Sequence, residues 1–108
     1  MIVSDGKVGL LEDVRRLRLR TQRVRDGKLT WVPHTPNKGE VCLIAGGPWW
    51  LTPSSRSLSI MYDAVEAVTG RYPAMLVAWN DAECPDAETA CRVWEKTADI
   101  IETEVKST

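Results

Sequence analysis

Apolar residues spaced three or four positions apart predict helices along much of this chain. The longest such stripe runs through residues 86–105, over about five helical turns, and the opposite side of this stretch is acidic. The members of the stripe are Ala87, Ala90, Cys91, Trp94, Ala98, Ile101 and Val105. We expect a C-terminal helix over residues 86–105 that packs on the core through this stripe.

A second stripe predicts a helix over residues 9–26, with Gly27 as its stop. Its members are Leu10, Val14, Leu17, Thr21 and Val24. A third predicted helix covers residues 57–69, where Leu58, Met61, Val65 and Val68 share one face and Gly70 follows. In "YPAMLVAW", Pro73 suits a first helical position, whereas Met75 to Val77 would also fit a short strand.

The pattern between the first two helices, over residues 27–56, leaves the structure open. "GKLTWVPHTPNKGE" is rich in turn residues, with "LTWV" as a short extended piece that an N-terminal strand would pair with. "EVCLIAGG" fits a buried strand or a helical turn, and we favour the helical turn. "PWWLTPSSR" is expected to form a loop.

Composition limits the class of protein. The chain has 108 residues, 44% hydrophobic and 27% charged, which is typical of one soluble domain spanning residues 1–108. The longest apolar stretch, "VCLIAGGPWWL", is too short and too broken to cross a bilayer, and the N-terminus has no apolar signal core. We therefore expect a mainly α-helical protein of three or four helices, with short strands near the N-terminus, located in the cytoplasm without a membrane partner.

Charge is distributed unevenly. Residues 1–54 carry nine Lys or Arg and five Asp or Glu, whereas residues 55–108 carry five and ten. The predicted helix over residues 9–26 holds six arginines, of which Arg16, Arg20 and Arg23 fall opposite the apolar stripe. Such a face is either solvated, paired with the acidic last helix, or bound to an anion such as nucleic acid. Pairing or solvation is favoured because the total charge is close to neutral.

The stretch "AWNDAECPDAETAC" places several oxygen ligands close together: Asn80, Asp81, Glu83, Asp86 and Glu88. A calcium loop of EF-hand type is excluded, because Pro85 and Asp86 stand at the fifth and sixth places counted from Asp81. We favour carboxylates, namely Asp81, Asp86 and Glu88, at the N-terminus of the last helix, where they meet free backbone N–H groups. Trp79 is expected to anchor the preceding turn in the core, with Asn80 and Asp81 bonding its backbone.

Thiol and imidazole groups suggest no site. His34, Cys42, Cys84 and Cys91 match no zinc spacing, and a Cys42–His34 nucleophilic pair has no orienting group in the sequence. Because neither a P-loop nor a dinucleotide fingerprint occurs, we assign no catalytic residue, metal or cofactor.

The segments "VCLIAGG", "AWND" and "AETACRVWEKTADIIE" together resemble an uncharacterised family of small helical domains in actinobacteria and their phages. The resemblance covers residues 9–105, and its distinctive motif is Trp79, Asn80 and Asp81 before the last helix. This chain departs from the family at "GGPWWLTP", where family members continue as helix. The resemblance implies no activity, but it suggests a bacteriophage accessory protein in the cytosol of a bacterial host.

Three functions follow as hypotheses. The leading one is a non-enzymatic interaction protein that binds a bacterial host protein through a charged or aromatic face, with Arg16, Arg20, Arg23, Trp49 and Trp50 as candidates. The alternative is nucleic-acid binding through the arginine-rich first helix. The third is a metal-dependent hydrolase that uses Asp81, Glu83 and Asp86. The sequence leaves the partner and the oligomeric state open.

Overall fold

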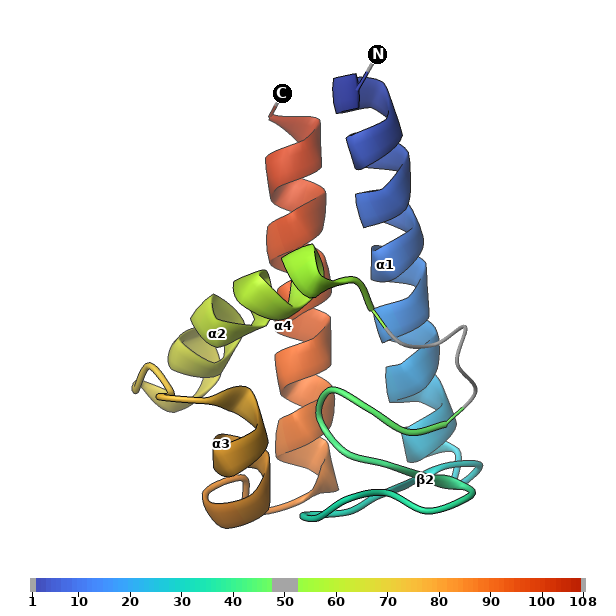
Figure 1. The fold of residues 1–108 in the computed structure, drawn as a ribbon, viewed down its shortest axis with the longest axis vertical. Coiled ribbons are helices and arrows are strands. Elements are labelled where there is room, and N and C mark those ends of the chain that lie inside the picture. Colours follow the sequence, from blue (N-terminus) through green and yellow to red (C-terminus); the bar gives the residue numbers. More distant parts are fainter. Residues whose placement is uncertain (1, 48–52, 108) are drawn as a thin grey trace.

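Two long antiparallel helices, α1 (Ile2–Arg25) and α4 (Ala87–Lys106), and a shorter helix, α2 (Ser55–Thr69), that crosses α4 form the frame of the molecule (Figure 1). The computed structural model describes residues 2–47 and 53–107, and the side chains from residue 9 onward within these ranges. The elements in chain order are α1 (Ile2–Arg25), β1 (Thr30–Trp31), β2 (Glu40–Val41), α2 (Ser55–Thr69), α3 (Leu76–Ala82) and α4 (Ala87–Lys106). The mainly helical class, with minor strand content, is therefore confirmed.

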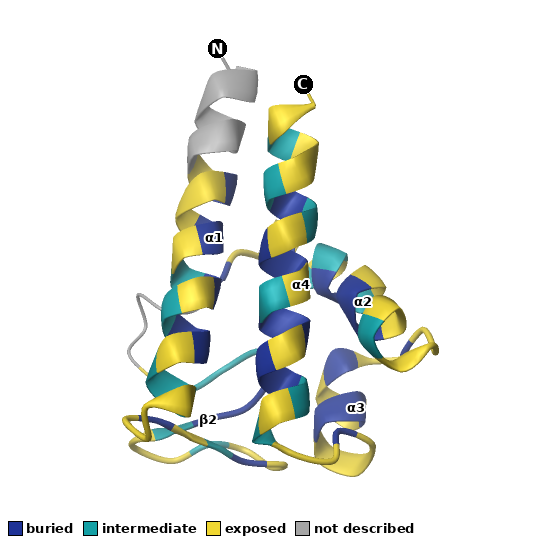
Figure 2. Ribbon diagram, turned by 180° about the vertical axis from the view of Figure 1, so that it is seen from behind, coloured by how far each residue is buried: buried dark blue, intermediate teal, exposed yellow. Residues whose placement is uncertain are grey.

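The core lies where α1 and α2 pack against α4. From α1, Leu10, Val14 and Leu17 are buried, and from α4 the buried stripe includes Cys91, Trp94, Ala98 and Ile101. Figure 2 shows the buried faces of α1 and α4 turned toward one another, with the exposed faces outward. The amphipathic stripes of the sequence thus identified the packing faces of both helices correctly.

The predicted helix bounds hold closely for two of the three helices. The last helix begins after Asp86, and α2 spans Ser55–Thr69 with Gly70 as its left-handed C-terminal cap at φ 86°. The first helix ends at Arg25, as the Gly27 stop suggested, but it begins at Ile2 rather than at residue 9. Gly6 and Gly9 weaken the helical signal there, since glycine has a low helix propensity.

Two predictions about the β segments are wrong. Residues 2–8 belong to α1 and form no strand; β1 instead pairs in parallel with β2, with Thr30 opposite Glu40 and Trp31 opposite Val41. "EVCLIAGG" forms no helical turn, because β2 leads into a tight turn that ends at Gly46, at φ 86°. A Cβ at Gly46 would collide with the Glu40 carbonyl oxygen, so the turn requires glycine.

The short helix α3 is neither the strand nor the Pro73-led helix that the sequence allowed. Met75 is extended, at φ −145° and ψ 138°, and helix begins only at Leu76. Trp79 and Asn80 therefore lie inside α3 rather than in a turn, and both are buried. The burial of Trp79 confirms its expected role as an anchor of this region in the core.

Candidate functional site

Arg20 lies in the interior and does not belong to a solvated face. Its side chain is fully buried and donates hydrogen bonds to the carbonyl oxygens of Cys42 (3.0 Å), Ala45 and Gly46 (3.4 Å). Its guanidinium also stacks over the Trp94 ring, 5.2 Å from the ring centre. The predicted exposure of Arg20 is therefore wrong, because the turn after β2 covers this second side of α1. Burial lowers the pKa of Arg20 to about 10, so the group stays charged at neutral pH.

The flanking arginines pair with α4. Arg18 bonds Glu102 at 3.0 Å and Asp99 at 3.3 Å, and Arg25 bonds Glu95 at 2.9 Å and Glu88 at 2.5 Å. The hydrogen bonds from Arg18 lower the pKa of Glu102. These contacts confirm that the oppositely charged first and last helices pack together. The pairs are exposed to solvent, so they orient the helices more than they stabilise the fold.

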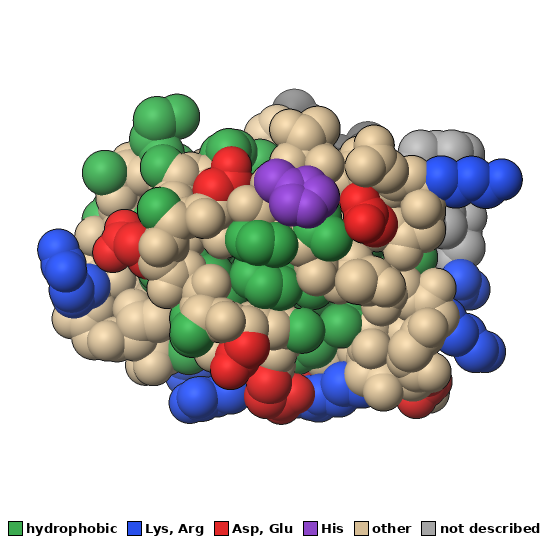
Figure 3. All heavy atoms as spheres, turned by 90° about the horizontal axis from the view of Figure 1, so that it is seen from below, with side chains coloured by type: hydrophobic (Ala, Val, Ile, Leu, Met, Phe, Trp, Pro, Cys, Tyr) green, Lys and Arg blue, Asp and Glu red, His purple; other side chains and the backbone are tan. Residues whose placement is uncertain are grey.

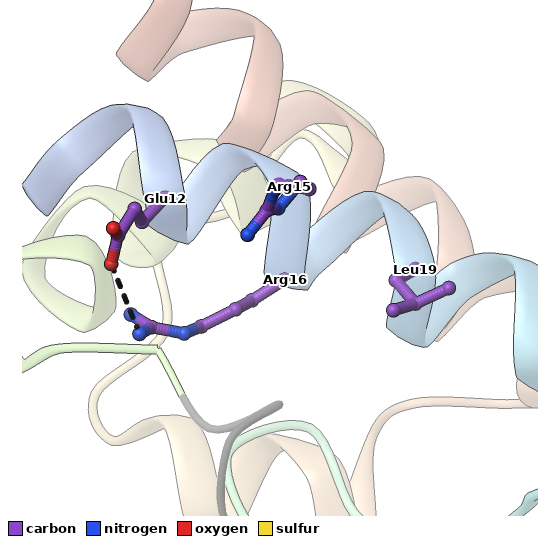
Figure 4. Close-up of a pocket in the computed structure, with 4 residues that line it drawn as sticks. All are labelled: Glu12, Arg15, Arg16 and Leu19. Atoms are coloured by element: carbon purple, nitrogen blue, oxygen red, sulfur yellow. Dashed lines mark hydrogen bonds and ion pairs between the residues drawn. The ribbon is translucent and has the colours of Figure 1, made fainter. Parts of the chain in front are cut away.

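Arg16 is half-buried and is also paired, at 2.8 Å with Asp13 and at 3.3 Å with Glu12. A hollow of about 240 Å³ is lined by Glu12, Arg15, Arg16 and Leu19. In Figure 4, Arg16 reaches back to Glu12 while Arg15 lies apart from this pair. Arg15 is exposed and Arg23 is partly buried. The arginines of α1 thus have several different environments and do not form one uniform cationic face.

Asp13 is a buried carboxylate that the sequence reading missed. Its Oδ2 accepts hydrogen bonds from the Ser54 backbone N–H (3.0 Å), the Ser54 hydroxyl (2.5 Å) and the Ser57 hydroxyl (2.6 Å). Burial by itself raises the pKa of Asp13, but the bonds from Ser54, Ser57 and Arg16 together outweigh this effect and lower it. Its place three residues after Leu10, on the edge of the apolar stripe, was the available signal.

Asn80 is the structural centre of the Trp-Asn-Asp motif. Its Oδ1 accepts from Trp31 Nε1 at 2.8 Å and from the Leu43 N–H at 3.0 Å. Its Nδ2 donates to the Val32 carbonyl at 3.2 Å and to Asp81 Oδ1 at 2.9 Å. Asn80 was expected to bond the backbone of its own turn, but its backbone partners lie in the distant β segments. This side chain fastens α3 to the chain around both strands.

The remaining acidic residues have separate roles. Asp86 caps α4 by accepting from the Thr89 N–H (2.8 Å) and hydroxyl (2.7 Å), which lowers its pKa. This confirms one of the three predicted capping carboxylates. Glu88 lies in the first turn of α4 but pairs with Arg25, whereas Asp81 lies on α3 and caps nothing. Asp81 and Glu83 are both exposed.

No metal-binding cluster of three His, Cys, Asp or Glu side chains occurs among the described residues. Cys42, Cys84 and Cys91 are buried free thiols, and burial raises the pKa of Cys84 and of Cys91 to about 11. These two thiols are therefore protonated at neutral pH and poor nucleophiles. Of the aromatic candidates, Trp49 and Trp50 lie outside the described residues.

Exposed apolar side chains mark a different surface from the one that the sequence suggested. Of the four large hydrophobic residues exposed in the described part of the chain, three lie within residues 72–77: Tyr72 (58% exposed), Met75 (61%) and Val77 (45%). We name these three the α3 corner. Figure 3 shows the end of the molecule formed by α3 and the loops around the strands, where hydrophobic side chains gather beside the histidine, with acidic and basic side chains around them. Sequence reasoning missed this surface because it could not assign "AMLV" to helix or strand.

Comparisons with known proteins identify no relative of this chain: no protein-family model, no curated protein and no solved structure matches it. Across the described residues, no helix is long and apolar enough to cross a membrane. The resemblance to the actinobacterial family stays a prediction.

Proposed function

We propose that this protein is a non-enzymatic interaction protein that binds another protein through the α3 corner. The observation that carries the proposal is the exposure of Tyr72, Met75 and Val77 within six residues of one another. Clustered exposed hydrophobic side chains are a feature of protein-binding sites, whereas isolated ones are ordinary. Leu11, the fourth exposed large hydrophobic residue of the described chain, lies far from them in sequence, on α1.

The α3 corner is held firmly by the residues beneath it. Tyr72 stacks on Tyr62 of α2, with ring centroids 5.6 Å apart and planes inclined by 26°. Leu76 and Trp79 are buried, and Asn80 fixes the rotation of α3 through its three hydrogen bonds to Trp31, Val32 and Leu43. A surface on a firmly held helix loses little backbone entropy on binding, which favours its use as a docking site.

The family resemblance supplies the biological setting of the proposal: a bacteriophage accessory protein that acts in the cytosol of an actinobacterial host and binds a host protein. The positions of the three carboxylates considered for a metal-dependent hydrolase, Asp81, Glu83 and Asp86, support a non-enzymatic role. Asp86 caps a helix, while Asp81 and Glu83 are exposed.

The nucleic-acid alternative has less support. Arg20 is buried, and Arg16, Arg18 and Arg25 bond carboxylates within the chain. Each of these internal contacts would compete with a phosphate for the same guanidinium. Salt-sensitive retention on DNA or RNA that Arg15→Ala and Arg23→Ala abolish would revive this alternative.

Affinity capture from actinobacterial lysate tests the proposal when wild type is compared with surface variants. We expect wild type to recover a specific protein that the double variant Met75→Asp, Val77→Asp no longer recovers. Leu11→Asp, which alters an equally exposed leucine on α1, should still recover it. Circular dichroism verifies that both variants remain helical. The proposal fails if the captured proteins are the same for wild type and the Met75, Val77 variant.

A further inference from the structure

We infer that the partner docks on the α3 corner as an amphipathic helix whose Lys or Arg side chain pairs with Asp81. This inference rests on the proposed function and specifies the chemistry of the partner. It follows from three observations: the outer face of α3, the charges around it, and the way in which Asp81 is held.

The outer face of α3 is mostly apolar and has little bulk. The residues of α3 that are exposed on this face are Val77, Ala78, Asp81 and Ala82, whereas Leu76, Trp79 and Asn80 are buried. Positions 77, 78, 81 and 82 follow helical spacing, so they form one continuous face. The two alanines let another helix approach closely, and Val77 with neighbouring Met75 provides the apolar anchor.

The segment of chain that carries this face is acidic. Residues 70–91 contain four acidic residues and a single basic one, Arg71. Asp86 is engaged in capping α4 and Glu88 in pairing with Arg25, which leaves Asp81 and Glu83. Neither of these two forms an ion pair with another described residue. An apolar face with an acidic margin complements an apolar segment flanked by Lys or Arg.

Asp81 is the exposed member of the Trp-Asn-Asp motif, and its neighbour Asn80 positions it. Asn80 Nδ2 donates to Asp81 Oδ1 at 2.9 Å, and Asn80 is itself locked by three bonds to Trp31, Val32 and Leu43. No described residue donates a hydrogen bond to Asp81 Oδ2. The carboxylate is therefore oriented by one oxygen and offers the other to a cationic donor at little entropic cost.

A second copy of this chain fits the same face poorly. A two-fold contact through the α3 corner would place the acidic margins of both copies, each with Asp81 and Glu83, in one interface. Like charges placed together in an interface oppose association. The charge pattern therefore favours a basic partner over self-association through this face.

Selection from a display library of helical peptides of about five turns, with randomised apolar and polar positions, tests the inference. Three forms of the full chain serve as bait: wild type, the double variant Asp81→Lys, Glu83→Lys, and the control Glu104→Lys. The control reverses one charge at an exposed site near the end of α4. Wild type and Glu104→Lys should enrich amphipathic peptides with Lys or Arg beside the apolar stripe. The Asp81, Glu83 variant should enrich Asp or Glu instead.

A peptide enriched on wild type should bind Asp81→Asn about tenfold more weakly, the loss expected for one charged pair in an interface. The inference is overturned if no peptide is enriched, or if the enriched peptides keep their charge pattern on the Asp81, Glu83 variant. The two proposals can fail separately. If a captured host protein depends on Met75 and Val77 but not on Asp81 and Glu83, the proposed function stands and only the basic-helix inference is wrong.

Discussion

Two buried polar side chains, Arg20 and Asn80, tie the irregular chain around β1 and β2 to the helices. Arg20 reaches three carbonyl oxygens between Cys42 and Gly46, and Asn80 reaches backbone groups of Val32 and Leu43. Short strands of two residues have few ladder bonds of their own, so these side chains supply the missing partners. They hold the segment in place where neither helix nor sheet does.

Asn80→Ala should lower the free energy of unfolding by about 3 kcal/mol or more, because it leaves Trp31 Nε1, the Leu43 N–H and the Val32 carbonyl without partners in the interior. Urea denaturation followed by Trp fluorescence measures this change. Asn37→Ala, at an exposed asparagine, is the matched control and should change stability by less than about 0.5 kcal/mol. A loss of stability at Asn80 as small as that at Asn37 would contradict the structural role described above.

At the residue scale, the sequence indicates which side chains have a structural role, but it does not indicate which groups they bond. Trp79 and Asn80 stand out as a motif, but the partners of Asn80 outside α3 lie 37 to 49 residues away along the chain. The helical pattern places Arg20 opposite the apolar stripe, on the side that is exposed when a helix packs through one face only. Since α1 is covered on a second side by the turn after β2, that pattern wrongly assigns Arg20 to solvent.

At the scale of elements, Asp13 joins α1 to the start of α2. It accepts bonds from Ser54, the N-terminal cap of α2, and from Ser57 in its first turn. A carboxylate at this position also interacts favourably with the positive end of the α2 dipole. The ionised Asp13 side chain therefore connects α1 to the N-terminus of α2.

Because the folded-state pKa of Asp13 lies below its unfolded value, the ionised carboxylate stabilises the fold at every pH above about 3.9. This contribution is lost as the pH falls from there through the lowered folded pKa. Asp13→Asn should be less stable at pH 7 by about 2 kcal/mol, and its stability should fall less steeply below pH 4. Thermal unfolding of both proteins between pH 2 and pH 7 measures the difference, with Asp86 and Glu102 titrating equally in each. Parallel pH profiles for the two proteins would show that Asp13 does not contribute in this way.

Elements with one buried face were predictable, whereas those that depend on distant partners were not. Helices α2 and α4 follow their stripes and caps, from the cap residues Ser54 and Asp86 onward. The segment after β2 reads as a buried helix or a strand, because its actual bonding partner, Arg20, lies more than twenty residues earlier. For α3, burial of Trp79 and Asn80 decides which side faces out, and the sequence alone does not set this rotation.

At the scale of the whole molecule, part of the uneven charge of the chain is paired within the fold. The basic helix α1 and the acidic helix α4 lie side by side and exchange ion pairs through Arg18 and Arg25. This pairing favours the α3 corner over the arginines as a binding face. The exposed apolar residues of the corner lie close in sequence to Asp81 and Glu83, which form no ion pair with another described residue. Identifying the candidate site therefore requires both the packing of the helices and the pairing of their charges, and the sequence alone gives neither in full.

Site-specific photo-crosslinking in actinobacterial cells tests the central claim most directly. Val77 on α3 or Leu11 on α1 is replaced by p-benzoylphenylalanine, and the two positions are equally exposed at 45%. After irradiation, a discrete crosslinked protein should form from position 77 and not from position 11. A discrete product from position 11 alone, equal products from both positions, or none from either would contradict docking through the α3 corner.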